Sequence, residues 1–254
     1  MSTCVETTTL GSRNLAMPAP QAASQPRPNG THVREHRSVL AEAEKRCLIW
    51  LAHRLPRAIN SDHLTALGAV AMVGTGAAFA AASVQPLALL LVPLTLAVNW
   101  FGDSLDGTVA RVRNAQRPRY GYYLDHVVDV ANATVLFTGL AVSGLAGPWI
   151  AAALLAAYLL LAAESFLATH ALGVFRISFA GFGPTELRIL LSIGALVALF
   201  RPVVTPFGIA PVRMFDLGGA IGAAGMLAAF ALNAIRNTRE LYRAEPLPPA
   251  RTDG

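Results

Sequence analysis

Six apolar stretches constrain this chain more than any other feature, because a helix of about 20 apolar residues crosses the hydrocarbon core of a bilayer. The expected spans lie near residues 63–83, 86–112, 121–143, 148–171, 185–203 and 213–236. The composition agrees, with 54% hydrophobic and 14% charged residues and a mean hydropathy of +0.48. We therefore predict an all-α, polytopic membrane protein with six transmembrane helices.

The segments outside these spans differ in character. Residues 1–34 are rich in Ser, Thr, Pro and Ala without apolar periodicity, and we predict a disordered cytoplasmic tail. Apolar residues at helical spacing over 35–57 predict an amphipathic helix on the membrane surface, with Trp50 at the headgroup level. A surface helix packed on protein is the alternative. The membrane domain is expected over 35–240, and 241–254 is a predicted flexible C-terminal tail.

The arginines and lysines predict the orientation in the membrane. They concentrate in the N-terminal segment, between the second and third spans and after the last span, whereas the turns at 84–85 and 144–147 carry none. Cytoplasmic loops carry such an excess, so both termini are expected in the cytoplasm, at the inner or plasma membrane if the protein is bacterial. The net charge of +5 is thus a topology signal, and no nucleic-acid partner is expected.

Four aspartates lie where two apolar runs meet the loop between the second and third spans: Asp103, Asp106, Asp125 and Asp129. Ionised carboxylates are costly there unless a positive charge lies among them. On helices, the first two share one face, and Gly121 and the last two share another at steps of four. Antiparallel helices would bring both faces together, and carboxylate oxygens suit Mg²⁺ or Mn²⁺. The site is expected to open to the cytoplasm.

Small and basic residues accompany the aspartates. Gly107 and Gly121 lack side chains where a nucleotide or phosphate would approach the backbone. Arg111 offers a permanent fork of donors suited to phosphate oxygens.

The full pattern is Asp103-x2-Asp106-Gly107-x2-Ala110-Arg111-x9-Gly121-x3-Asp125-x3-Asp129, and it resembles the signature of the CDP-alcohol phosphatidyltransferase family. The resemblance implies transfer of a substituted phosphoryl group from a CDP-alcohol to an acceptor hydroxyl, with release of CMP, in phospholipid biosynthesis. It implies metal binding by Asp103, Asp106 and Asp125, with two Mg²⁺ or Mn²⁺ ions expected. Asp129 would be the general base and also a metal ligand, although the spacing by itself leaves open which aspartate is the base.

The resemblance also assigns further contacts. The CDP portion would be held by the first two aspartates of the pattern and its small and basic residues, namely Asp103, Asp106, Gly107, Ala110, Arg111 and Gly121. One of the two substrates would be lipidic, membrane lipid would surround the enzyme, and a homodimer is implied. Gly218, Gly222 and Gly225 permit close helix packing without requiring it.

Several polar residues near the pattern each have two alternative interpretations. His126 follows the third aspartate and is either a second base or a packing residue. Arg117 and Arg119 either bind phosphate on a substrate or set topology, and Glu164 either lines the acceptor pocket or pairs with an arginine. The identity of the acceptor, and which substrate carries the lipid, stay open.

Two other classes of membrane protein share parts of this pattern. An intramembrane prenyltransferase also binds diphosphates through Mg²⁺ and aspartates, but it would need longer acidic motifs and more spans. A divalent-cation transporter would need acids near the bilayer midplane, whereas these acids cluster near one end of their spans.

Overall fold

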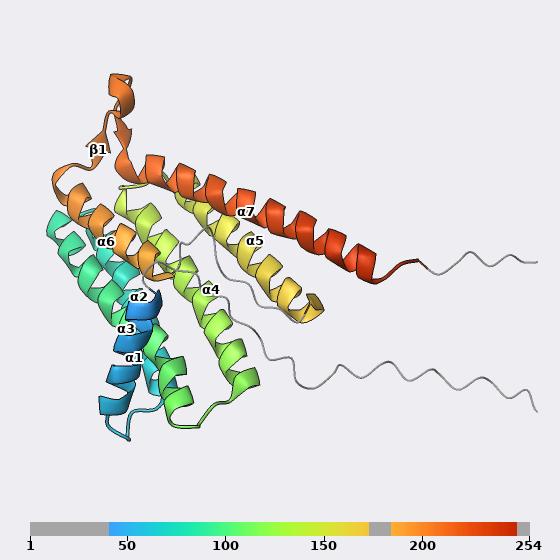
Figure 1. The fold of residues 1–254 in the computed structure, drawn as a ribbon. Coiled ribbons are helices and arrows are strands. Elements are labelled where there is room, and N and C mark those ends of the chain that lie inside the picture. Colours follow the sequence, from blue (N-terminus) through green and yellow to red (C-terminus); the bar gives the residue numbers. More distant parts are fainter. Residues whose placement is uncertain (1–40, 173–183, 248–254) are drawn as a thin grey trace, which may run out of the picture. The chain divides into compact units, whose positions relative to one another are not determined.

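The computed structural model describes residues 41–172 and 184–247. The predicted N-terminal tail, the start of the predicted surface helix at 35–40 and the end of the C-terminal tail lie outside this part of the chain. Helices make up almost all of the described residues, which confirms the all-α fold. The helices are α1 (Ala41–Arg54), α2 (Ser61–Ala81), α3 (Leu91–Val112), α4 (Pro118–Ser143), α5 (Pro148–Leu172), α6 (Pro184–Phe200) and α7 (Met214–Ala244) (Figure 1). Short elements complete the list: η1 (Pro86–Leu90), β1 (Val203–Val204), η2 (Pro206–Gly208) and β2 (Val212–Arg213).

Five segments of the described chain are long and apolar enough to cross a membrane: α2, η1 with α3, α4, α5 and α7. They coincide with the predicted spans to within a few residues at most ends. The exception is α7, which continues to Ala244 and into the segment predicted as a tail. The fifth predicted span corresponds to α6, whose 17 residues lie at the short end of the range for a crossing helix.

The centre of the bundle is α2, which packs extensively against both α3 and α4. Glycines allow the backbones to approach at both crossings. A Cβ atom on Gly102 of α3 would lie 2.5 Å from the carbonyl oxygen of Leu64 on α2. A Cβ on Gly139 of α4 would collide with the Gly76 carbonyl in the same way. Small residues at such contacts are the usual means of close helix packing in membranes.

Replacing Gly139 with alanine should therefore destabilise the bundle. The added methyl group has no room against the backbone of α2, and overpacking of this kind typically costs about 1–3 kcal/mol. Thermal unfolding in detergent, followed by circular dichroism, should show a lower midpoint for Gly139→Ala. The matched control is Gly218→Ala, because no described atom lies within 4 Å of a Cβ at that position. Equal midpoints for the two variants would contradict the α2–α4 crossing.

The helix α1 packs on protein along one face, and contact of its exposed face with the membrane surface stays a prediction. Leu48 and Ala52 are buried against Leu64 of α2 and against α3. Cys47 and Trp50 lie on the exposed side of α1. The carboxylate of Glu44 accepts hydrogen bonds from Trp100 Nε1 (2.7 Å), Thr185 Oγ1 (2.8 Å) and Ser104 Oγ (3.4 Å).

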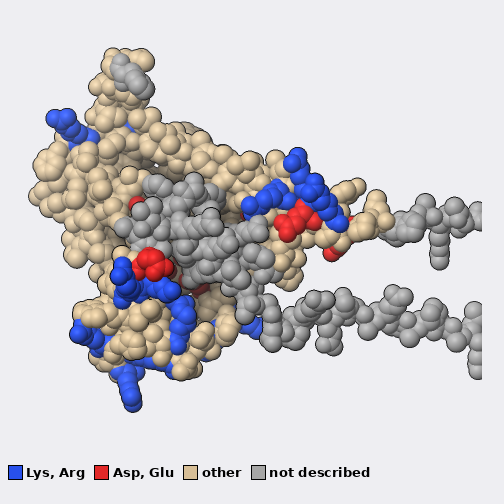
Figure 2. Space-filling view, viewed as in Figure 1, with Lys and Arg blue, Asp and Glu red and all other residues tan. Residues whose placement is uncertain are grey.

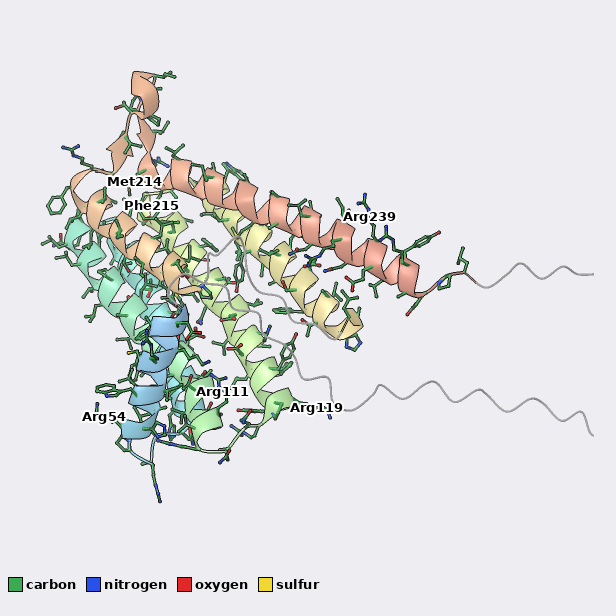
Figure 3. All side chains as sticks on the ribbon, viewed as in Figure 1. Arg54, Arg111, Arg119, Met214, Phe215 and Arg239 are labelled. Carbon is green, nitrogen blue, oxygen red and sulfur yellow. The ribbon has the colours of Figure 1, made fainter. Side chains whose placement is uncertain are left out.

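Basic side chains lie mainly at one end of the helices. Figure 2 shows Lys and Arg gathered over α1 and the adjoining helix ends, and again near the C-terminal end of α7. In Figure 3, Arg54, Arg111 and Arg119 lie at the same end, whereas Met214 and Phe215 lie at the other. Phe215 packs edge-to-face on Phe79 with ring centroids 5.8 Å apart, in the apolar core between α2 and α7.

Candidate active site

Two carboxylates of α3 are held by hydrogen bonds to neighbouring helices and to their own backbone. Asp106 Oδ2 accepts a hydrogen bond from Thr65 Oγ1 of α2 at 2.6 Å, and its Oδ1 accepts one from the amide of Gly107. One turn earlier, Asp103 Oδ2 pairs with Nη2 of Arg188 on α6 at 2.5 Å. The α3 pair is therefore positioned from both sides, by α2 and by α6.

The α4 pair, Asp125 and Asp129, lies across from these residues. The helices α3 and α4 make little contact with each other because both pack on α2. The four acids nevertheless belong to one electrostatic cluster. Asp106 is subject to the charges of Asp103 and Asp125, and the hydroxyl of Tyr158 on α5 is subject to those of Asp129, Asp103 and Asp125. These mutual influences place the four acids within electrostatic range of one another, and the expected meeting of the two acidic helix faces around an ion stays a prediction.

The donor set fits a hard divalent ion, because it consists of carboxylate oxygens. Within the described residues, however, no three acidic, His or Cys side chains converge in a geometry that would hold an ion. Asp103 is turned toward Arg188, and Asp106 is turned toward Thr65 and Gly107.

The remaining residues of the pattern line the same region of α3 and α4. The guanidinium of Arg111 lies over Gly107, with Nη1 3.3 Å from the position of a Cβ there, and donates to Thr108 Oγ1 at 3.0 Å. Ala110, on the same helix, is half-buried. A Cβ on Gly121 would meet no described atom within 4 Å, so space is open at the start of α4. This space is consistent with a nucleotide approaching the backbone.

His126 occupies a packed position. Its ring lies against Tyr122, 4.1 Å between centroids, and against Phe166 of α5 at 4.6 Å. Nδ1 lies 2.6 Å from the Tyr122 carbonyl oxygen and 3.8 Å from Asp125 Oδ2. The imidazole is buried, and these contacts favour the packing interpretation over a role as a second base.

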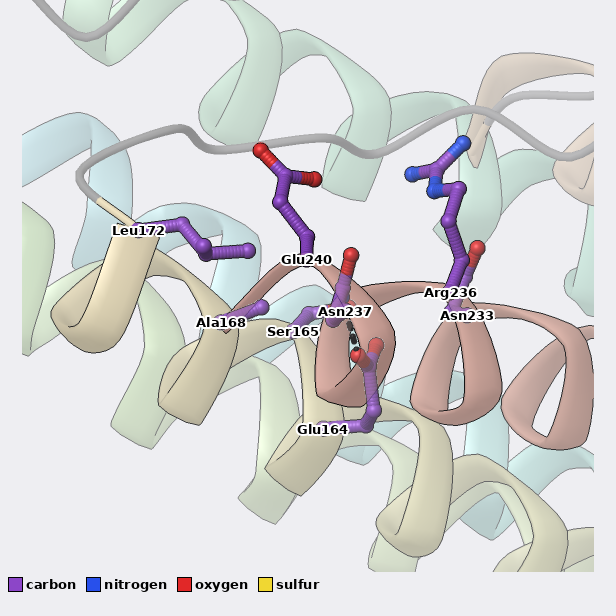
Figure 4. A pocket seen from close by; sticks show the side chains of 8 residues that line it. All are labelled: Glu164, Ser165, Ala168, Leu172, Asn233, Arg236, Asn237 and Glu240. Carbon is purple, nitrogen blue, oxygen red and sulfur yellow. Dashed lines mark hydrogen bonds between the residues drawn. The ribbon is translucent and has the colours of Figure 1, made fainter. Parts of the chain in front are cut away.

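Two of the three candidate acceptor residues have separate partners. Arg117 is ion-paired with Asp62 and lies over the ring of Tyr120, and the hydrogen bond to Asp62 raises the pKa of its guanidinium. Arg119 is exposed at the start of α4. Glu164 lines a small pocket between α5 and α7, where it accepts a hydrogen bond from Asn237 Nδ2 at 2.6 Å (Figure 4). The pairing expected for Glu164 is therefore with an amide and not with an arginine.

Four residues around the cluster were not assigned to it from the sequence: Thr65, Asn99, Tyr158 and Arg188. A signal existed for two of them. Arg188 and Asn99 each interrupt an apolar stretch, and polar groups at such depth usually have a functional partner. Thr65 and Tyr158 gave no comparable signal.

The profile of the CDP-alcohol phosphatidyltransferase family matches residues 60–232, more than half of the chain. The chain belongs to this family. It is accordingly a transferase of the CDP-alcohol phosphatidyltransferase type and an integral membrane protein. Members of the family are generally dependent on a divalent metal.

Among solved structures, the chain is similar to the phosphatidylinositol phosphate synthase PgsA1 of Mycobacterium tuberculosis, determined with CDP-DAG bound. The two share 22% sequence identity with a TM-score of 0.48, over 82% of this chain and 98% of the synthase. A search of curated proteins finds no match.

Proposed function

We propose that the protein transfers a substituted phosphoryl group from a CDP-alcohol to an acceptor hydroxyl and releases CMP, in phospholipid biosynthesis. The observation that carries the proposal is the family match over 60–232, which includes both acidic helices and the full aspartate pattern. The donor is CDP-diacylglycerol or a CDP-linked polar alcohol, so one substrate is lipidic.

The reaction is an in-line displacement at the phosphorus distal to cytidine. Asp129 accepts the proton of the acceptor hydroxyl as the new O–P bond forms. The bond from this phosphorus to the oxygen shared with CMP breaks, and CMP leaves with the bonding electron pair. Arg111 donates to phosphate oxygens, and Gly107, Ala110 and Gly121 leave the nucleotide access to the helix backbones.

Asp103, Asp106 and Asp125 are the proposed ligands of Mg²⁺ or Mn²⁺, with Asp129 as a further ligand and two ions in the complete site. A bound ion would neutralise the diphosphate and make CMP a better leaving group. Asp103 and Asp106 also contact the CDP portion in this arrangement. Glu164, Arg117 and Arg119 stay candidates for the acceptor side.

The proposed orientation places the acidic cluster and both termini on the cytoplasmic side. In support, Arg54, Arg111 and Arg119 lie at the end of the molecule where α3 connects to α4, and this connection is the middle of the aspartate pattern. A homodimer is proposed from the family resemblance.

Purified protein in detergent or vesicles should release CMP from a CDP-alcohol in the presence of Mg²⁺, and EDTA should abolish the release. The donors to compare are CDP-diacylglycerol, CDP-choline and CDP-ethanolamine, each with candidate hydroxyl acceptors, because the donor that reacts identifies the lipidic partner. CMP is measured by liquid chromatography. Absence of CMP with every donor and acceptor pair, in protein that remains folded, would contradict the proposed reaction.

A further inference from the structure

We propose that Arg188 is an internal counter-ion for Asp103, so that the divalent ion binds tightly only together with the diphosphate substrate. The inference rests on the proposed function and concerns how strongly the binding of the ion and the binding of the nucleotide depend on each other. It starts from the position of Arg188 within the apolar helix α6, where its side chain is only 14% exposed.

Two contacts fix the guanidinium. Nη2 of Arg188 donates to Asp103 Oδ2 at 2.5 Å, and Nε donates to Asn99 Oδ1 at 2.8 Å. Because the guanidinium is planar and its donors are rigidly spaced, two such contacts define its orientation. The positive charge is therefore held against Asp103 and is not directed to the membrane surface as a topology anchor would be.

Asn99 is itself locked in place. It is 1% exposed, and its Nδ2 donates to the Gly68 carbonyl of α2 at 2.9 Å, which leaves Oδ1 to accept from Arg188. The backbones of α2 and α3 are in close contact here, since a Cβ on Gly68 would lie 3.2 Å from the amide nitrogen of Asp103. Contacts among α2, α3 and α6 thus fix the position of the Arg188 side chain.

The charge of Arg188 is felt by Tyr158 of α5, a residue that is also subject to the charges of three of the aspartates, Asp103, Asp125 and Asp129. A guanidinium cannot lose its proton under ordinary conditions, so this positive charge is permanent. It repels an incoming divalent ion, and it engages the Asp103 oxygen that the ion would use.

The diphosphate of a CDP-alcohol offsets the repulsion between Arg188 and the divalent ion. It adds negative charge, which attracts the ion, and it offers phosphate oxygens to which the guanidinium fork is suited. Ion and nucleotide should therefore bind with positive coupling, and by linkage each should raise the affinity of the other by the same factor. Without Arg188, the acidic cluster should bind the ion well on its own.

The test is a Mn²⁺ titration of the purified full-length protein, followed by electron paramagnetic resonance. It is run with Mn²⁺ alone and with Mn²⁺ plus CDP, and a protein-free titration corrects for the Mn²⁺–CDP complex. Arg188→Met replaces the charge with an apolar side chain suited to α6. It should bind Mn²⁺ alone about tenfold or more tightly than wild type. CDP should tighten Mn²⁺ binding to wild type by a factor within about 5–150, and this factor should fall toward one in the variant.

Three comparisons complete the experiment. Arg188→Lys keeps the positive charge and should bind Mn²⁺ like wild type. Arg213→Gln disrupts the ion pair with Asp216 at the other end of the molecule and should change nothing in the titration. Mn²⁺ should raise the unfolding temperature of Arg188→Met more than that of wild type, because the ion replaces the lost partner of Asp103. If Arg188→Met does not fold, Arg188→Gln is titrated in its place.

The outcomes separate the two proposals. If wild type binds Mn²⁺ but the folded charge-free variant binds it no more tightly, or if Arg188→Lys behaves like Arg188→Met, the counter-ion role is wrong and the proposed reaction stands. If wild type binds no Mn²⁺ with or without CDP, the metal site of the proposed function fails, and the counter-ion role fails with it.

Discussion

Asp129→Asn is expected to lower the rate of CMP release by about 10²–10⁴-fold, the usual contribution of a general base. Asparagine has nearly the same shape as aspartate but accepts no proton from the acceptor hydroxyl. The steady-state rate with Mg²⁺ and the preferred donor is the measurement. Glu42→Gln is a suitable control, because it removes an exposed carboxylate from α1 outside the acidic cluster.

The base and ligand roles of Asp129 are distinguished by Mn²⁺ binding. A residue that acts mainly as base should leave the Mn²⁺ affinity in the presence of CDP close to that of wild type. If Asp129→Asn releases CMP at a rate near that of wild type, another group takes the proton, and Asp129 loses its assignment. Loss of Mn²⁺ binding in parallel with activity would make it chiefly a metal ligand.

Asp106→Asn is expected to lower both Mn²⁺ binding and CMP release, the rate by on the order of 10³-fold, because a metal ligand supplies several kcal/mol of charge stabilisation. Asp106 lies centrally, with Thr65 on one oxygen and the Gly107 amide on the other. An amide in its place lacks the charge that the diphosphate-bound ion requires. Activity and Mn²⁺ titration should therefore fall together.

Thr65→Val provides the matched comparison for Asp106→Asn. It keeps the carboxylate and nearly the same side-chain volume but removes the 2.6 Å hydrogen bond to Asp106. Loss of a hydrogen bond to a charged group costs roughly 1.5–3 kcal/mol, so its effect on the rate should be smaller than that of Asp106→Asn. A Thr65→Val variant as inactive as Asp106→Asn would mean that the hydrogen bond, and not the carboxylate charge, carries the effect.

The sequence predicted the helices well because their apolar runs are long and are bounded by proline. Three helices begin at a proline: α4 at Pro118, α5 at Pro148 and α6 at Pro184. The helix α3 follows the short helix η1, which begins at Pro86. The spacing of the aspartates likewise placed Asp103 and Asp106 on one helix and Asp125 and Asp129 on the next, and their convergence on one ion stays a prediction. Local periodicity was sufficient to place the helices along the chain.

Contacts between distant segments could not be predicted in this way. Arg188 and Asp103 are 85 residues apart, and nothing in either segment indicates that α6 packs beside α3. The packing of α1 likewise depends on distant segments, because Leu48 and Ala52 are buried against α3 and against Leu64 of α2. Local periodicity does not show which helix lies beside which.

The three hydrogen bonds to Glu44 have a consequence for where the catalytic unit begins. The family profile starts at residue 60, after α1, yet the carboxylate on α1 is the acceptor for Trp100, Ser104 and Thr185. A truncated chain starting at residue 60 would leave an indole and two hydroxyls without that acceptor, directly beside Asp103 and three residues before Arg188. The smallest active fragment should therefore include α1, which precedes the family domain and supplies a hydrogen-bond acceptor to its helices.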